Sequence, residues 1–237
     1  MVMVIKDMLR SASLCLPLEV GFSCKPHRAK AFRASFCDDW KVVRLALIHG
    51  AHIEAVGDVE LNSEGYIDFE DCDGAVTNVP GILLTTSNGD CIPVWTCDPV
   101  KRCVGLAHAG WRGTLAGIAA SLVRRMKEVY GCEPEDIVAH IGPGIGACCF
   151  EVGEDVAQSF LEKYPWAEEY CYAGRTGKPF LDLKGINAHI LSFESVGEIE
   201  VSSRCTCCEE ELFYSYRRSA DTSRMLAYIG IKGLDLS

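Results

Sequence analysis

The sequence predicts a single α/β or α+β domain in which mixed β-sheets pack together and are flanked by helices. Three observations predict this class. The 237 residues are 49% hydrophobic and 24% charged, which is the balance of a chain that buries a core. Short runs rich in Val, Ile and Leu alternate with turn residues, as strands do. A few longer segments have helical spacing, but they do not alternate with the strands as regular βαβ units would.

Several apolar runs are predicted to be strands because each is short and bounded by turn residues. Glycines are spread along the chain, and no repeat or linker divides it, so we expect one domain over residues 1–237. The predicted strands are Val42–Ile48, Gly81–Thr86, Pro93–Thr96, Arg102–Ala107 and Ile137–Ile141.

Helical spacing predicts three helices. In Thr114–Tyr130 the apolar residues fall near one face, and Gly131 ends the segment. Gly153–Tyr164 has acidic residues in its first turn, which favour a helix N-terminus, and it closes before a proline. Leu183–Val196 is the third predicted helix.

The charge balance excludes several partners. A formal net charge of −10 argues against nucleic acid, which requires clustered Lys and Arg. The longest basic cluster, Arg124, Arg125 and Lys127, is predicted to be a solvated helix face. No run of about twenty apolar residues occurs, and Pro17 interrupts the apolar stretch near the N-terminus. We therefore expect a soluble, cytoplasmic protein with no membrane partner.

Fourteen cysteines in a long chain without an export signal are expected to be mostly thiols. Cys205, Cys207 and Cys208 form a Cys-x-Cys-Cys cluster, but no partner pair at zinc-finger spacing follows it. The spacing therefore predicts no second metal site, and Cys208 is expected to be a packed thiol.

Three residues with metal-binding or nucleophilic side chains stand near the ends of apolar runs. His49 follows one run, Cys91 follows Asp90 in Asn-Gly-Asp-Cys, and His108 ends another run before the long predicted helix. Three ligands would hold a zinc ion with an open fourth position, where a water of lowered pKa binds. His52 is expected outside the ligand set, because strand side chains alternate. Spacing alone leaves two further readings open: a Cys91 nucleophile with His108 as its base, or packed core residues.

The surrounding motifs resemble the laccase-domain family, also called YfiH-like or multicopper polyphenol oxidase-type proteins. Its members share a His-Gly motif, Ala-Asp-Cys-x-Pro-Val, His-Ala-Gly-Trp-Arg-Gly, Gly-Pro-x-Ile-Gly-x-Cys-Cys-Tyr-Glu-Val and Cys-Thr. In this chain these motifs stand in the same order at His49, residues 90–94, residues 108–113, residues 142–152 and residues 205–206. The resemblance extends from about Gly21 to Gly230.

The resemblance implies a purine nucleoside phosphorylase whose zinc is bound by His49, Cys91 and His108. Asp90, beside a ligand, is the candidate that moves a proton, and Arg112 or a nearby arginine is the candidate that orients phosphate. The catalytic candidates are thus Asp90, Cys91 and His108, and the substrate-binding candidates are Lys25, Arg112, Cys149, Cys205, Arg217 and Arg224.

The chain departs from the family pattern at three places. Lys25 stands where members carry Arg, so the charge is kept but the guanidinium fork is lost. Asn88 and Gly89 replace Thr-Ala before Asp-Cys, whereas the closing Gly-Arg becomes Ser223-Arg224 and retains its arginine.

Two other segments carry expectations from their residues. The glycine-rich loop at residues 142–152 could present backbone N–H groups to phosphate, or it could form a tight crossover turn with two buried thiols. Tyr214–Arg218 alternates like a strand, with a core aromatic pair on one face. Arg217 is then a phosphate candidate and Arg218 a surface charge. Trp111 is expected to be a packing anchor.

The resemblance implies cleavage of adenosine, inosine or guanosine by phosphate, with adenosine deaminase and methylthioadenosine phosphorylase as further activities. Two other classes remain: a cysteine hydrolase acting on an amide of peptidoglycan precursors through Cys91 and His108, and a non-catalytic metal-binding module. Copper is the less favoured metal, because six histidines are too few for a multicopper centre. A monomer or homodimer is expected.

Overall fold

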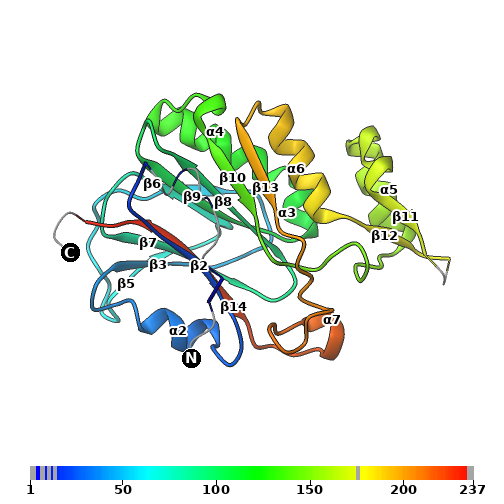
Figure 1. Cartoon of the computed structure of the whole chain (residues 1–237), viewed down its shortest axis with the longest axis horizontal. Coiled ribbons are helices and arrows are strands. Elements are labelled where there is room, and N and C mark those ends of the chain that lie inside the picture. Colours follow the sequence, from blue (N-terminus) through cyan, green and yellow to red (C-terminus); the bar gives the residue numbers. More distant parts are fainter. Residues whose placement is uncertain (1–3, 6–8, 10–11, 13–14, 175–176, 234–237) are drawn as a thin grey trace.

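Two six-stranded mixed sheets stack face to face, and helices cover their outer faces (Figure 1). The computed structural model describes residues 4–5, 9, 12, 15–174 and 177–233. The first sheet has the order β1-β2-β14-β7-β3-β5. Its strands are β1 (Val4–Ile5), β2 (Leu18–Ser23), β14 (Met225–Ile231), β7 (Ile82–Asn88), β3 (Lys41–Leu45) and β5 (Tyr66–Phe69).

The second sheet has the order β13-β10-β8-β9-β6-β4. Its strands are β13 (Glu198–Val201), β10 (Val138–Ile141), β8 (Ile92–Asp98), β9 (Cys103–Ala109), β6 (Gly74–Thr77) and β4 (Ile53–Ala55). A small two-stranded sheet pairs β11 (Cys171–Ala173) with β12 (Pro179–Leu181). Both large sheets contain parallel and antiparallel pairs, which confirms the predicted mixed architecture.

The helices gather mainly on the second sheet (Figure 1). They are α2 (Ala29–Ala34), α3 (Trp111–Ala116), α4 (Ile118–Tyr130), α5 (Glu154–Lys163), α6 (Leu183–Phe193) and α7 (Tyr216–Ser219), with 3₁₀ turns η1 (Pro134–Asp136) and η2 (Pro165–Tyr170). α3, α4 and α6 cover the second sheet, whereas α2 packs on the first sheet.

The core is layered because strand side chains alternate between faces. In β8, Trp95 points into the layer between the two sheets, where it packs with Phe22. Its neighbour Val94 points the other way, into the layer between the second sheet and the helices, with Leu122. Every residue of β8 and β9 is buried, which explains why these strands are nearly continuous apolar runs.

The predicted strands are confirmed with shifted ends, since the run Val42–Ile48 leaves the strand after Leu45. The helix predicted over Thr114–Tyr130 is instead two helices, α3 and α4. Gly117 lies between them with φ 91°, a left-handed conformation that breaks the helix and suits glycine. Gly131 ends α4 as predicted.

The strand predicted at Tyr214–Arg218 is wrong. Ser215 accepts a hydrogen bond from the Arg218 N–H and thereby caps the short helix α7. Only Tyr214 of the expected core pair is buried, whereas Tyr216 is exposed. Because Ser, like Asp and Asn, competes for backbone N–H groups, it favours a cap over a strand here.

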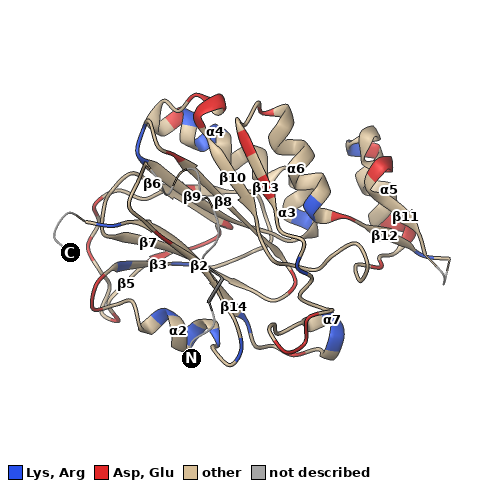
Figure 2. Cartoon of the chain, viewed as in Figure 1, with Lys and Arg blue, Asp and Glu red and all other residues tan. Residues whose placement is uncertain are grey.

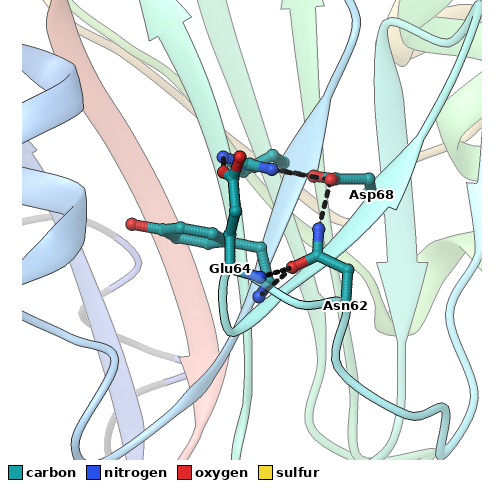
Figure 3. A network of polar contacts seen from close by, with 5 residues as sticks. Asn62, Glu64 and Asp68 are labelled. Atoms are coloured by element: carbon teal, nitrogen blue, oxygen red, sulfur yellow. Dashed lines mark hydrogen bonds and ion pairs between the residues drawn. The ribbon is translucent and has the colours of Figure 1, made fainter.

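An ion-pair network holds the outer strand β5 against β3 (Figure 3). Arg44 of β3 donates two hydrogen bonds of 2.6 Å to the Asp68 carboxylate and one of 2.7 Å to Glu64. Asn62 accepts from the backbone N–H groups of Glu64 and Tyr66 and donates to Asp68. The bond from Arg44 lowers the pKa of Asp68. Charged side chains thus cover this sheet edge.

Basic and acidic residues occur together along the helices and loops (Figure 2). Within the described part of the chain, no helix has both the length and the apolar character that crossing a bilayer requires.

Candidate functional site

The sheet topology brings three separate loops to one place. β3 and β7 are parallel neighbours, so the loops that follow them, carrying His49 and Cys91, leave the same edge of the first sheet. Both loops cross to the second sheet, where β8 pairs antiparallel with β9 and sets Ile92 opposite Ala109. Cys91, just before β8, therefore lies beside His108 near the end of β9.

His49, Cys91 and His108 form a three-residue group. One ligand atom from each lies within 4.8 Å of the other two. The two imidazole rings meet edge to face with centroids 5.1 Å apart. Gly110 passes so close that a Cβ there would lie 3.1 Å from both the Cys91 Sγ and the His49 ring. The absent side chain thus allows the three groups to converge.

Asp73, which no sequence motif marked, orients two members of this group. Its fully buried carboxylate accepts the backbone N–H groups of Ile48, His49 and Gly50 at 2.7–3.2 Å. The same carboxylate bonds the His108 Nδ1 at 3.1 Å. This bond keeps the proton on Nδ1, so Nε2 of His108 is the nitrogen that can bind a metal once it gives up its own proton. His49 itself has φ 63°, so Asp73 holds its loop in a left-handed conformation.

The pKa values of Cys91 and His108 are shifted in opposite directions. Burial alone would raise the pKa of the Cys91 thiol, but the hydrogen bonds and charges of His108 and His49 outweigh it and lower the pKa to about 6. Burial would lower the pKa of His108, but Asp73 and Cys91 raise it to about 9. At neutral pH the metal-free site is therefore a thiolate beside an imidazolium.

This charge state predicts selective alkylation of Cys91 in metal-free protein. With a pKa of about 6, roughly nine-tenths of the thiol is thiolate at pH 7, so its rate with iodoacetamide should change little from pH 7 to pH 9. Cys72 and Cys97, whose pKa burial raises to about 12, should stay unlabelled and serve as internal controls. Peptide mass mapping measures each rate. A Cys91 rate that climbs about tenfold per pH unit, as for an unperturbed thiol, contradicts the thiolate.

Asp73→Asn is expected to weaken metal binding by about 10- to 100-fold, the usual cost of losing a partner that orients a metal ligand. All four groups that approach Asp73 are donors, so an amide NH₂ would face at least one of them. Titration with zinc measures the affinity. Asp98→Asn is the matched control, since Asp98 is another buried carboxylate that accepts two backbone N–H groups. Equal affinity in both variants would show that Asp73 does not orient the site.

A cavity of about 490 Å³ opens beside this group. This volume suits a small-molecule ligand. Two arginines, one carboxylate and two aromatic rings join the three ligand candidates in its wall. The lining residues are Leu47, His49, Ser87, Gly89, Asp90, Cys91, His108, Ile145, Phe150, Tyr216, Arg217 and Arg224.

Asp90 and Arg217 are fixed to each other. One Asp90 oxygen accepts the Thr206 hydroxyl at 2.7 Å, and the other accepts the Arg217 backbone N–H at 2.7 Å. The Arg217 Nη1 donates to the carbonyls of Cys149 and Glu151 at 2.9 and 2.8 Å. The Arg217 cation is therefore anchored in the cavity wall.

Arg224 reaches the same wall across Gly89. Its Nη1 donates to the carbonyls of Asp221 and Ser223. A Cβ at Gly89 would lie only 3.3–3.4 Å from the Arg224 side chain, so glycine lets the arginine pack closely there. The neighbouring Asn88 is buried and donates to the Cys91 carbonyl. Both departures at residues 88–89 thus shape the site.

Four of the predicted substrate residues are not among the described residues that line the cavity. Lys25 donates to the Glu210 carbonyl at 2.8 Å and lies over Tyr214. The Arg112 guanidinium stacks on Trp111. The Cys149 and Cys205 thiols belong to a separate cysteine group, although the Cys149 carbonyl holds Arg217.

The glycine-rich loop at residues 142–152 does not offer a full phosphate cradle. Its Ile145 N–H donates to the Asp90 carbonyl at 2.8 Å, and its Gly146 N–H donates to the Cys205 Sγ at 3.2 Å. The loop is a crossover turn, but its two cysteines are exposed (Cys148) and half-buried (Cys149) rather than buried.

Three other expectations are settled by the structure. Arg218 is no surface charge, because it is largely buried and donates to the carbonyls of Thr206, Cys207 and Phe213. His52 is exposed, lies outside the three-residue group and pairs with Glu54. Tyr216, expected in the core, lines the cavity instead.

Spacing alone predicted no second metal site, but the fold assembles a second group of metal-binding side chains. Cys205 and Cys208 do find a partner pair, but it precedes them in the chain, as Cys148 and Cys149. Zinc-finger spacing applies to cysteine pairs that are close in the sequence, so it does not identify two distant pairs that the fold brings together. Cys208 is accordingly exposed rather than packed.

Residues 21–232 match the family model described as multi-copper polyphenol oxidoreductase laccase. Purine nucleoside phosphorylase YlmD of Geobacillus stearothermophilus is 40% identical over 196 residues, which cover 77% of this chain and 69% of that protein. Purine nucleoside phosphorylase YfiH of Escherichia coli is 33% identical over 189 residues, covering 80% of this chain and 73% of that protein.

Solved structures share the fold. The Bacillus licheniformis hypothetical protein YfiH superposes with a TM-score of 0.83 at 32% identity, covering 91% of this chain and 93% of that one. YlmD from Geobacillus stearothermophilus also has a TM-score of 0.83, at 31% identity over 91% of this chain and 92% of that one.

Proposed function

The chain belongs to the multi-copper polyphenol oxidoreductase laccase family, and we propose that within it this protein is a zinc-dependent purine nucleoside phosphorylase. Relatives named purine nucleoside phosphorylase support the reaction class. The observation that carries the proposal is the cavity that joins His49, Cys91 and His108 to two arginines and two aromatic rings.

The three ligand candidates fit a zinc ion. Two imidazoles and a thiolate are donors that zinc favours, and three protein ligands leave a position open for catalysis. The pKa of Cys91, lowered to about 6, favours the thiolate that zinc binds. Asp73 holds the His108 Nδ1, so the opposite ring nitrogen, Nε2, faces the Cys91 side. When bound, the ion would supply Lewis acidity at the open position.

The remaining residues account for binding and orientation. In phosphorolysis a phosphate oxygen attacks C1′ of the ribose, and the bond from C1′ to the purine nitrogen breaks. The purine keeps the electron pair and takes up a proton. The anchored cations of Arg217 and Arg224 hold phosphate for this attack. Phe150 and Tyr216 offer ring faces for the purine. Asp90 lies at the wall beside Cys91 and is the candidate that moves the proton.

The test is a product analysis by chromatography. Adenosine with phosphate should give equal amounts of adenine and ribose 1-phosphate, and omitting phosphate should stop the reaction. Inosine and guanosine should react in the same way, and methylthioadenosine should release adenine. Inosine formed from adenosine would indicate the accompanying deaminase activity. Free ribose as the sugar product, or no turnover of any of these nucleosides, would overturn the proposal.

A second function is favoured by the Cys91 and His108 pair. A thiolate beside an imidazolium is the resting state of a cysteine nucleophile with its acid, so amide hydrolysis by the metal-free chain is the competing candidate. A covalent acyl adduct on Cys91 after incubation with a peptidoglycan-type amide would favour this function. Zinc should suppress it, because the ion takes the thiolate.

A further inference from the structure

A second group of thiols lies outside the cavity wall. Cys148, Cys149, Cys205 and Cys208 each contribute a sulfur atom, and all four sulfur atoms lie within 4.8 Å of one another. The four cysteines are free thiols. None of them is among the described residues that line the cavity beside His108.

The fold holds the two cysteine pairs together through the backbone. β10 and β13 are parallel neighbours, and pairing continues beyond them, with Ser202 N–H donating to the Ile141 carbonyl at 2.8 Å. Gly144 then bridges to Cys205, and the Thr206 N–H donates to the Gly144 carbonyl at 3.1 Å. The segments after both strands therefore run together to the thiols.

A buried cation fixes the second segment. The Lys184 ammonium, on α6, donates to the carbonyls of Ser202 and Arg204 at 2.8 and 2.9 Å. Its side chain is almost fully buried. The chain directly before Cys205 is thus held by both a strand partner and a helix, so the thiol group is preorganised rather than a chance approach of loops.

The spacing of the sulfur atoms suits a single ion. The Cys208 Sγ lies 3.5 Å from the Cys148 Sγ and 3.4 Å from the Cys149 Sγ. A tetrahedral zinc ion with Zn–S bonds of about 2.3 Å separates its sulfur ligands by about 3.8 Å. A disulfide requires about 2.05 Å. An iron–sulfur cluster would spread the four thiolates over several iron atoms and place them farther apart.

A backbone donor also points at the group. The Gly146 N–H donates to the Cys205 Sγ at 3.2 Å. Such a bond compensates the negative charge that a thiolate carries, and the nearby Lys184 ammonium adds a positive charge. At Cys205 this arrangement matches the surroundings of a metal-bound thiolate, which backbone N–H groups commonly stabilise.

We propose that Cys148, Cys149, Cys205 and Cys208 bind a structural zinc ion, separate from the ion of the His49, Cys91 and His108 site. Four thiolates close the coordination sphere, so this ion has no open position for substrate. Each thiol gives up its proton as the ion binds.

The proposed ion lies behind the cavity wall. The Cys149 carbonyl holds the Arg217 guanidinium, and the Cys207 carbonyl holds that of Arg218. By tying residues 148–149 to residues 205–208, the ion would stiffen the segments on which both arginines depend. Loss of the ion should therefore lower the melting temperature of the protein, and it should affect the chemistry at His108 much less.

Native mass spectrometry of reduced protein, loaded with zinc, tests the proposal by counting ions. The full chain should carry two, and His108→Ala should keep one. The double variant Cys148→Ser with Cys208→Ser should carry one fewer than the full chain. The matched control, Cys37→Ser with Cys207→Ser, removes two thiols outside the group and should keep both ions.

Cobalt provides a readout that does not depend on how the double variant folds. The His108→Ala protein loaded with cobalt should show the strong sulfur-to-cobalt absorption of four thiolates, and its melting temperature should rise on loading. Equal ion counts in the full chain and the double variant, or the weak absorption of a single thiolate, would overturn the proposal. So would a mass lower by two hydrogens, which marks a disulfide.

Discussion

Replacing His108 with alanine is expected to abolish nucleoside turnover and binding of the ion at His49 and Cys91 together. Loss of a partner that orients a metal ligand commonly costs 10–100-fold, so loss of the ligand itself should cost more than about 100-fold in affinity. The chain should still fold, because Asp73 keeps three backbone donors when the ring is removed. Metal analysis and product chromatography on the same preparation measure both effects.

His140→Ala is the matched control. His140 is a buried histidine of the second sheet that pairs with a carboxylate, Glu200, at 3.0 Å, as His108 pairs with Asp73. It is not among the described residues that line the cavity. The control should lose some stability but keep its metal and its activity. Full activity in the His108 variant would remove this residue from the site.

Asp90→Asn is expected to lower kcat by about 100-fold or more, the usual contribution of a group that moves a proton. Asparagine can keep both contacts, because its carbonyl can accept the Arg217 N–H while its amide donates to the Thr206 hydroxyl. The substitution therefore removes the ionisable group and leaves the wall in place. KM for adenosine should change little.

Two further variants separate chemistry from positioning at Asp90. Thr206→Val removes one contact and keeps the carboxylate, so kcat should stay within a few fold of the parent. Asp90→Ala loses both contacts and should also raise KM for phosphate, since the Arg217 backbone N–H loses its acceptor and only the guanidinium contacts remain. If Asp90→Asn retained normal kcat while Asp90→Ala lost activity, Asp90 would be a positioning residue only.

Local patterns predicted most of the fold. Short apolar runs such as those of β8 and β9 identified strands, and Gly131 marked a helix end. Gly117 also carried a signal, but an isolated glycine in a helical pattern is often tolerated. Only the left-handed backbone at that residue showed the break. Ser215 shows the opposite case, in which a cap outweighed an alternating strand pattern.

The three candidate ligands could be found because each stands near the end of an apolar run and lies in a motif that resembles those of a known family. Asp73 could not be found in that way, since its role depends on the pairing of β6 with β9, which brings it to His108. An acidic residue directly before the short apolar strand β6 was the available signal. The four-cysteine group depends in the same way on the parallel pairing of β10 and β13.

We propose that an ion at His49, Cys91 and His108 drives phosphate-dependent cleavage of purine nucleosides. The most direct test adds zinc to metal-free protein in the Cys148→Ser, Cys208→Ser background and follows adenine release from adenosine with phosphate. Activity should be nearly absent without metal and should rise to a plateau at one equivalent of zinc. Equal rates with and without zinc would show that the ion has no part in the reaction.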